Sequence, residues 1–378
     1  MIQIEHIYEF FHENVFKDCV VVCASSGIYP KKTEYCPVDV KYYTNPKLAQ
    51  KLKDIEEDKR KGYYKQSLFK NKTIMFHDQE PVDQTLILPY IDQELLNPHQ
   101  LTVVTSEKSK DSEEWPRENV TTLYYFFHGF AALDWFRGYY ALNYNQPVAK
   151  DYQYDFVTFN RIVTGDRAYR KTFVDKLKEN NLTEQGLISY GVIDEEEDNG
   201  DRLVVDHNQV PASASADLVR TISADGCDDY SAFWHIVTET VFYYDKLHLT
   251  EKIFKPIVSK QPFMLLAAPG NLAYLKSYGF KTFDSVIDES YDTIKDDNER
   301  INAVVAQMKW YCNLSPEEKS RVIERLTPIV EHNFQHFYGE FKEIITDELL
   351  TNTKTLFTTL DYDDSSVDYA TVRKLLTS

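Results

Sequence analysis

Residues 236–256 constrain the fold of this chain more than any other stretch. An apolar run ends at the acid Glu239, a short loop follows, and Thr250 then opens an amphipathic segment that ends near Pro256. Threonine is a favoured helix cap, so a helix should start here. A second apolar run, residues 262–268, comes next. The order predicts strand, helix and strand, the repeating unit of α/β proteins.

The predicted helix start has the chemistry of an anion site. Backbone N–H groups without intrahelical partners gather in the first turn of a helix, and the helix dipole favours a negative ligand there. Lys252 and Lys255 would add positive charge to this turn. The pattern therefore predicts a phosphate site at Thr250.

The motif Thr250-Glu251-Lys252, followed by an apolar run and a Pro-Gly turn, resembles the donor-binding motif of two-Rossmann-domain (GT-B) glycosyltransferases. The α1,3-fucosyltransferases and the exostosin-like enzymes have a similar helix start. A longer match, which includes residues 78–81 and 279–292, is similar to glycosyltransferases of large tailed phages. The resemblance covers residues 70–310 and implies sugar transfer from a nucleotide-diphosphate donor. It also implies that Glu251 holds ribose or sugar hydroxyls.

The alternation of strands and helices occurs twice, which predicts two Rossmann-like parallel-sheet domains that face a cleft. The expected limits are 1–145 for an acceptor-side domain, 150–345 for a nucleotide-sugar domain and 346–378 for a linker and helix. The expected strands are residues 20–27, 73–77, 101–106, 121–126, 154–159, 187–190 and 232–238. The expected helices include residues 45–60, 128–137, 166–179 and 315–337.

Cations near the donor would stabilise the charge that develops on the leaving diphosphate. Besides Lys252 and Lys255, the candidates are Arg161 and Arg167. Arg167 can equally be an ordinary surface residue of its helix. Glu239 either contacts the donor sugar or organises the loop and the helix cap, and the sequence leaves both open.

The acceptor hydroxyl needs a general base, and the first domain offers three candidates. Asp78 and Glu80 follow a predicted strand and are held by Pro81, a sound position for a base. His128 is the rival, because the reference pKa of histidine suits proton abstraction near neutral pH. A lone histidine is more often a structural hydrogen-bonding residue.

The sequence predicts no metal requirement and no cofactor beyond the nucleotide sugar as co-substrate. It lacks an isolated Asp-x-Asp after a strand, and its five cysteines have neither CxxC nor Cys/His spacing. The acidic stretch 194–198 is expected to form a solvated surface loop. The missing glycine-rich fingerprint argues against an NAD-dependent epimerase.

Charge leaves two acceptor classes open. The net charge is −18, yet residues 31–72 hold twelve Lys/Arg and six Asp/Glu, a balance of +6 that leaves −24 for the rest. This basic, tyrosine-containing segment is most simply a solvated helical hairpin with its lysines outside. Its basic and aromatic residues can also hold a single-stranded or flipped nucleic acid, and with the phage resemblance they favour a hydroxymethylated DNA base as acceptor. The overall acidity favours a saccharide or a protein side chain. A non-catalytic nucleotide-sugar-binding module of the same fold is the alternative to an enzyme.

The sequence further predicts a cytoplasmic protein, within the host cell if a phage encodes it. No apolar stretch approaches the length of a membrane span, and no signal peptide is recognisable at the N-terminus. The odd number of dispersed cysteines fits reduced thiols. No feature predicts an oligomeric state, and no membrane partner is expected.

Overall fold

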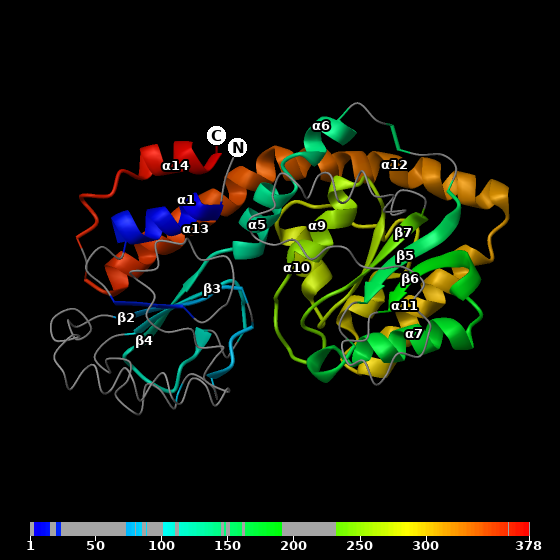
Figure 1. Ribbon diagram of the computed structural model, residues 1–378, viewed down its shortest axis with the longest axis horizontal. Helices are drawn as coiled ribbons and strands as arrows, with labels where there is room; N and C mark the ends of the chain where they lie inside the picture. The colour runs from blue at the N-terminus through cyan, green and yellow to red at the C-terminus, as the bar shows by residue number, and fades with distance from the viewer. Residues whose placement is uncertain are drawn as a thin grey trace. The chain divides into compact units, whose positions relative to one another are not determined.

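The structure is a computed structural model of the 378-residue chain, in which contacts define two compact units (Figure 1). The first unit comprises Met1–Ala131 and Glu343–Ser378, and the second comprises Ala132–Lys342. The structure describes residues 4–15, 20–23, 73–79, 81–84, 88, 101–109, 113–144, 147–148, 152–160, 163–190, 232–361 and 363–377.

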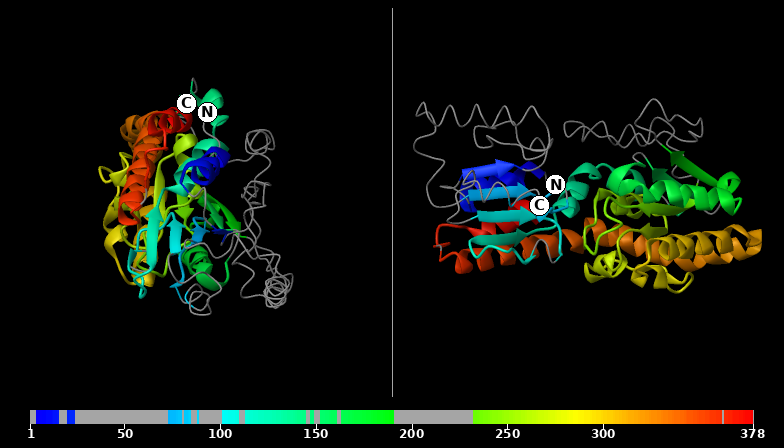
Figure 2. Two further views of the ribbon diagram at one scale, coloured as in Figure 1. Left: turned by 90° about the vertical axis from the view of Figure 1, so that its left-hand side faces the viewer. Right: turned by 90° about the horizontal axis from the view of Figure 1, so that it is seen from below.

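The first unit contains a parallel sheet with the strand order β1-β2-β3-β4. Its strands are β1 (Val20–Cys23), β2 (Thr73–His77), β3 (Leu101–Thr105) and β4 (Val120–Tyr124). Figure 2 (right) shows them side by side in this order, from blue to teal. Buried apolar residues fill β2 and β3, as expected for a sheet covered on its faces. The four predicted strands are confirmed within the described residues.

Helices from both ends of the chain lie on one side of this sheet. They are α1 (Ile4–Phe10), which continues as a π-helical turn to Val15, α13 (Glu340–Thr359) and α14 (Tyr369–Thr377). Helices α1 and α14 are in contact, and Figures 1 and 2 (left) show α13 beside them. A further helix, α5 (Phe127–Trp135), follows β4.

The second unit contains a parallel sheet with the strand order β6-β5-β7-β8. Its strands are β5 (Tyr154–Asn160), β6 (Gly186–Tyr190), β7 (Ala232–Thr238) and β8 (Phe263–Leu266). The chain order reverses between β5 and β7, which is the topological switch point of the sheet. In open α/β sheets, ligands bind outside the carboxyl ends of the strands at such a point.

Helices cover both faces of the second sheet (Figure 1). Contacts join α7 (Tyr169–Glu179) to α11 (Asp297–Cys312), and α9 (Glu251–Val258) to α12 (Pro316–Tyr338). The pair α7 and α11 lies on one face, and the pair α9 and α12 lies on the other. Two shorter helices, α6 (Tyr139–Asn143) and α10 (Asn271–Ser277), complete the unit. Both units are therefore Rossmann-like α/β parallel-sheet structures.

The central strand β7 is buried along its whole length. Trp234 on this strand is fully buried and meets the rings of Phe283 and Tyr311 edge to face, with centroids 5.6 and 6.0 Å apart. Such aromatic contacts add to the stabilisation that burial of a large apolar surface gives.

Three predicted features differ from the structure. Helix α9 continues through Pro256 to Val258, because the buried Ile257 and Val258 extend its apolar face. The segment predicted as a polar crossing after Tyr139 begins with the short helix α6. Residues 340–359, expected to end one domain and begin a linker, form the single helix α13.

The division by contacts also differs from the predicted domain limits. It falls at residues 131/132 and not near 145, and it counts residues 343–378 with the first unit. The reason lies in tertiary contacts such as that between α1 and α14, which local sequence patterns do not reveal. The predicted helix 45–60 and the acidic stretch 194–198 lie outside the described residues.

None of the helices within the described residues is both long enough and apolar enough to span a bilayer.

Candidate functional site

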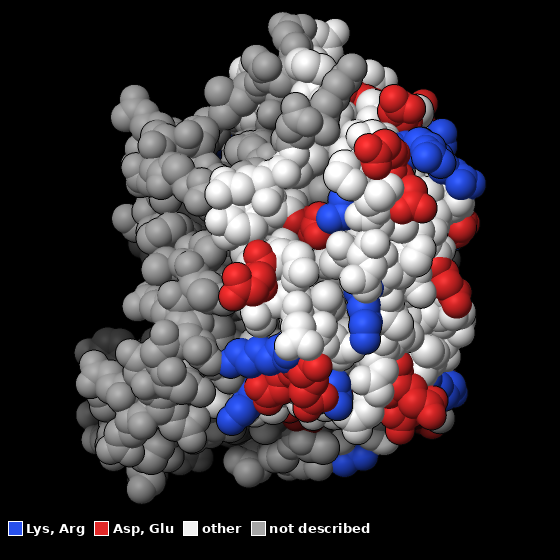
Figure 3. Space-filling view, turned by 90° about the vertical axis from the view of Figure 1, so that its right-hand side faces the viewer, with Lys and Arg blue, Asp and Glu red and all other residues white. Residues whose placement is uncertain are grey.

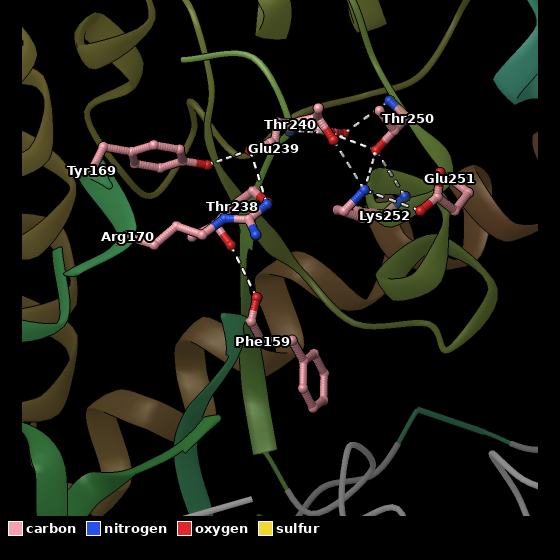
Figure 4. Close-up of polar contacts among 9 residues, drawn as sticks. All are labelled: Phe159, Tyr169, Arg170, Thr238, Glu239, Thr240, Thr250, Glu251 and Lys252. Carbon is pink, nitrogen blue, oxygen red and sulfur yellow. Dashed lines mark hydrogen bonds and ion pairs between the residues drawn. The ribbon is translucent and has the colours of Figure 1, made fainter. Parts of the chain in front are cut away.

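The loop between β7 and α9 leaves the sheet at the switch point and forms the centre of the candidate site (Figure 4). It starts at Glu239 and ends at Thr250, the cap of α9. Most of the loop is buried, and only Tyr243, Tyr244 and Asp245 are exposed. The loop is therefore a packed part of the second unit.

The carboxylate of Glu239 fastens the two ends of this loop together. It is fully buried, and it accepts hydrogen bonds from the backbone N–H of Thr250 (3.0 Å), the hydroxyl of Thr250 (2.5 Å) and the backbone N–H of Thr240 (3.1 Å). A buried carboxylate is tolerated where it is hydrogen-bonded in this way. The structure thus gives Glu239 the loop-organising role, and its contact with a donor sugar stays a prediction.

Thr250 caps α9 as the sequence predicts. Its hydroxyl proton goes to Glu239, so the oxygen lone pairs are left for the first turn of the helix. This oxygen accepts a long hydrogen bond from the backbone N–H of Lys252 (3.5 Å). Glu239 therefore orients the cap, and the cap positions the helix N-terminus.

Lys252 is held at this N-terminus by short-range polar contacts. Its ammonium lies 3.1 Å from the Thr250 hydroxyl, 3.3 Å from the Thr240 hydroxyl and 3.0 Å from the Glu251 carboxylate. The side chains of Lys252 and Glu251 are 36% and 29% exposed. Ion pairs at this exposure contribute little stability, so an arriving anion can replace the Glu251 carboxylate at little cost.

Lys255, one turn further along α9, has a different environment. Its residue is buried, and its ammonium lies 3.9 Å from the centroid of the Phe159 ring on β5. A cation over an aromatic face is attracted by the ring quadrupole, more strongly where water is excluded. The two predicted lysines are thus separated: Lys252 is half-exposed beside the cap, and Lys255 is packed against the sheet.

Of the two predicted arginines, the structure describes only Arg167. Arg167 is half-buried in a short 3-10 helix, Gly165–Arg167, that follows β5 and precedes α7. Arg161 lies outside the described residues. Whether either arginine contacts a phosphate stays a prediction.

Two residues of α7 that were not predicted as site residues hold the end of β7. Arg170 is buried and donates from Nη2 to the backbone oxygens of Thr238 (2.9 Å) and Glu239 (3.1 Å). The Tyr169 hydroxyl also donates to the Glu239 oxygen, and burial raises the pKa of Tyr169 to about 12, which keeps this donor protonated. The arrangement fixes the carbonyl groups at the carboxyl end of the strand (Figure 4).

A sequence signal for Arg170 existed. The residues at helical spacing after it, Phe173, Val174 and Leu177, are apolar, and all of them are buried on the same face of α7. An arginine on an apolar helix face needs buried hydrogen-bond partners. Those partners were not predictable, because they belong to β7, almost seventy residues later in the chain.

The next helix start along the chain, that of α10, already holds a carboxylate. Asp292 accepts hydrogen bonds from the backbone N–H groups of Leu272 (2.8 Å) and Ala273 (3.0 Å). Gly270, which precedes the helix, has the left-handed φ of 85° that favours glycine, and its N–H donates to the Asp292 backbone oxygen (2.7 Å). An anion would have to displace Asp292 here, so α9 is the better candidate.

In the first unit, the predicted base Asp78 lies at the carboxyl end of β2 and is fully buried. One carboxylate oxygen, Oδ2, accepts hydrogen bonds from the hydroxyls of Tyr8 (3.0 Å) and Tyr125 (2.5 Å). The other, Oδ1, has no hydrogen-bond partner among the residues that the structure describes. Burial raises the pKa of Asp78 to about 6, although both tyrosines act in the opposite direction. Asp78 therefore combines a perturbed pKa with a buried acceptor atom that the described residues leave unused.

The other base candidates have less definite surroundings. His128 is buried near the start of α5, and its electrostatic interaction with Asp78 is a minor influence that lowers the pKa of that carboxyl. Glu80 lies outside the described residues. The loop after Asp78 is anchored nearby, because the Val82 N–H donates to the Glu107 carboxylate (2.6 Å). The prediction that this loop faces Thr250 across a cleft involves both units and stays a prediction.

No group of three His, Cys, Asp or Glu side chains is arranged to hold a metal ion within the part of the chain that the structure describes. This leaves the predicted independence of metal to be tested by experiment.

Comparison of the chain with protein-family models, with curated proteins and with solved structures finds no match. The fold itself defines the class at the level of an α/β protein with two parallel, Rossmann-like sheets, and the function is argued from the site.

Proposed function

We propose that this protein is a glycosyltransferase that moves a sugar from a nucleotide-diphosphate donor to an acceptor hydroxyl. The second unit would bind the donor at the N-terminus of α9, and the first unit would supply the acceptor side, as in GT-B enzymes. The observation that carries the proposal is the Glu239–Thr250–Lys252 arrangement at the switch point of the second sheet. It combines a fixed helix start with a half-exposed ammonium, which suits a diphosphate.

The catalytic contribution of this arrangement would be electrostatic. The bond between sugar and diphosphate breaks, and negative charge grows on the leaving phosphate oxygen. An ammonium and helix N–H groups aimed at that oxygen stabilise the transition state more than the ground state. A base in the first unit would accept the proton of the acceptor hydroxyl as the new glycosidic bond forms, and Asp78, whose pKa burial raises to about 6, is suited to this task.

The acceptor class is part of the proposal that needs a separate test. A hydroxymethylated DNA base is the first candidate and a saccharide or protein hydroxyl is the alternative. On the face that Figure 3 shows, basic and acidic side chains of the described residues are interspersed, and neither sign forms a continuous field. Support for DNA therefore rests on the basic segment 31–72 of the sequence. DNA binding would weaken steeply with salt through counterion release, and saccharide binding would show almost no salt dependence.

The proposed donor is tested by thermal unfolding with UDP-, GDP-, ADP- and dTDP-linked sugars. At one hundred times its dissociation constant, a ligand stabilises the folded protein by about 2.7 kcal/mol. One of the four nucleotides should raise the unfolding temperature well above the others. Release of the nucleoside diphosphate in the presence of acceptor would then distinguish an enzyme from a binding module. The absence of a shift with all four donors would contradict the proposal.

A further inference from the structure

Two adjacent tyrosines are exposed on the mostly buried loop between β7 and α9, and the exposed Asp245 follows them. Tyr243 and Tyr244 are 41% and 49% exposed, whereas Val241 and Phe242 just before them are 3% and 1% exposed. An isolated exposed aromatic residue is ordinary, but two adjacent exposed rings on a well-packed loop present a continuous aromatic surface.

Packing of Phe242 against α7 and α11 holds the loop that carries these tyrosines in place. Phe242 stacks on Tyr169 with ring centroids 4.0 Å apart. The Arg300 guanidinium also lies over the Phe242 ring, 4.0 Å from its centroid. Arg300 also donates to the Phe242 backbone oxygen (2.9 Å). Phe242 is thereby fixed by two helices, α7 and α11.

Tyr243 itself is oriented by the same group of rings. It meets Phe242 and Tyr169 edge to face, with centroids 5.4 and 6.0 Å apart. The Tyr244 hydroxyl donates to the Asp166 carboxylate (3.1 Å), which ties the second ring to the short helix before α7. Aromatic rings that are already ordered lose little conformational entropy when a ligand covers them.

The exposed pair lies close to the candidate phosphate site along the chain. The Thr240 hydroxyl is 3.3 Å from the Lys252 ammonium, and Tyr243 is three residues further on. Three residues of extended chain span at most about 11 Å. A nucleoside diphosphate has comparable dimensions, with its base at one end and its phosphates at the other.

We infer that Tyr243, with Tyr244 beside it, is the surface on which the base of the donor nucleotide stacks while the N-terminus of α9 holds the diphosphate. Every nucleobase has an apolar π-face, and stacking on an aromatic side chain recognises it. Two adjacent side chains are too small a surface for a stable protein partner, which typically buries about 800 Å² on each side. The inference rests on the proposed function and adds a base subsite to it.

The experiment compares two probes by isothermal titration calorimetry: a nucleoside diphosphate (UDP, GDP, ADP or dTDP, whichever binds the wild type) and inorganic pyrophosphate. Tyr243→Leu should weaken nucleoside diphosphate binding about tenfold or more, since it removes a stacking partner. It should leave pyrophosphate affinity unchanged. Tyr243→Phe, which keeps the ring, should bind both probes like the wild type. Lys252→Ala should weaken both probes.

Trp310→Leu is the matched control. Trp310 has the same exposed fraction as Tyr243, 41%, and it lies on α11 ten residues beyond Arg300, about 15 Å further along the helix. This variant should bind both probes normally.

Unchanged nucleoside diphosphate affinity in Tyr243→Leu, or an equal loss of pyrophosphate affinity, would overturn the base subsite and leave the proposed donor site standing. A wild-type protein that binds none of the four diphosphates would contradict the proposed function and this inference together.

Discussion

Glu239 and Thr250 lie eleven positions apart in the sequence, and the carboxylate of the first receives both the backbone N–H and the hydroxyl of the second. The pair closes the loop that leaves the central strand β7, and it orients the cap of α9. The geometry of the candidate donor site thus depends on one buried carboxylate.

Replacing Glu239 by alanine should destabilise the protein by about 3 kcal/mol or more, because buried N–H groups lose a charged acceptor. Thr250→Ala should cost about 1–2 kcal/mol, the usual effect of losing a helix cap. Urea unfolding of both single variants and of the double variant measures their coupling. We expect a coupling energy of about 1 kcal/mol or more. Additive effects would show that the two residues act independently.

The two lysines of α9 should respond differently to substitution. Lys252→Ala should leave unfolding almost unchanged, since this side chain is half-exposed, and should weaken nucleotide binding by about 1.5–3 kcal/mol. Lys255→Ala should instead lower the free energy of unfolding by about 2 kcal/mol, because it removes a buried stem and a cation over Phe159. Thermal unfolding and calorimetric titration of both variants separate the two roles. A destabilised Lys252→Ala with normal nucleotide affinity would remove Lys252 from the site.

Asp78 should make the free energy of unfolding fall as the pH rises from 4 to 7, the opposite of the usual effect of a carboxylate with a lowered pKa. Its pKa is raised from 3.8 to about 6 in the folded protein, so between these values the folded state holds more protons than the unfolded state. Its contribution to stability is therefore complete below pH 3.8 and is lost as the pH rises through 6. The loss amounts to about 3 kcal/mol at 1.36 kcal/mol per pKa unit.

Asp78→Asn removes this titration while keeping the side-chain shape. The difference in unfolding free energy between variant and wild type should therefore shift in favour of the variant by about 2.4 kcal/mol from pH 4 to pH 7. Urea titrations at several pH values measure it. A constant difference across this range would show that Asp78 has an ordinary pKa.

The general base is identified by substituting the three candidates and measuring transfer and donor binding separately. Asp78→Asn or Glu80→Gln should lower the transfer rate about a hundredfold or more and leave donor affinity nearly intact. If both amide variants transfer sugar normally and His128→Ala does not, the base is His128. The loop after β2 would then have a structural role only.

Sugar transfer should survive chelation by EDTA. Lysine and arginine side chains would supply the positive charge that a divalent ion brings to other transferases. The assay compares nucleotide release before and after dialysis against the chelator. Loss of activity that manganese or magnesium restores would show that a metal ion takes part in the reaction.

Local features of the sequence were sufficient to predict much of the secondary structure. The apolar runs at β2 and β7 predict both strands with the bounds that the structure has. Ser315 and Glu318 predict a capping box, and both of its hydrogen bonds are present at the start of α12. These predictions succeed because strand burial and helix caps depend on residues a few positions apart.

The environments of the candidate site residues were decided by tertiary structure. Asp78 is buried by Tyr8 and Tyr125, which are 70 and 47 residues away along the chain. Lys252 and Lys255 share a helix start and a charge, yet only the second packs against β5. Sequence alone determined which residues could carry the chemistry. Their burial and partners followed from packing between distant segments, which sets pKa values and accessibility.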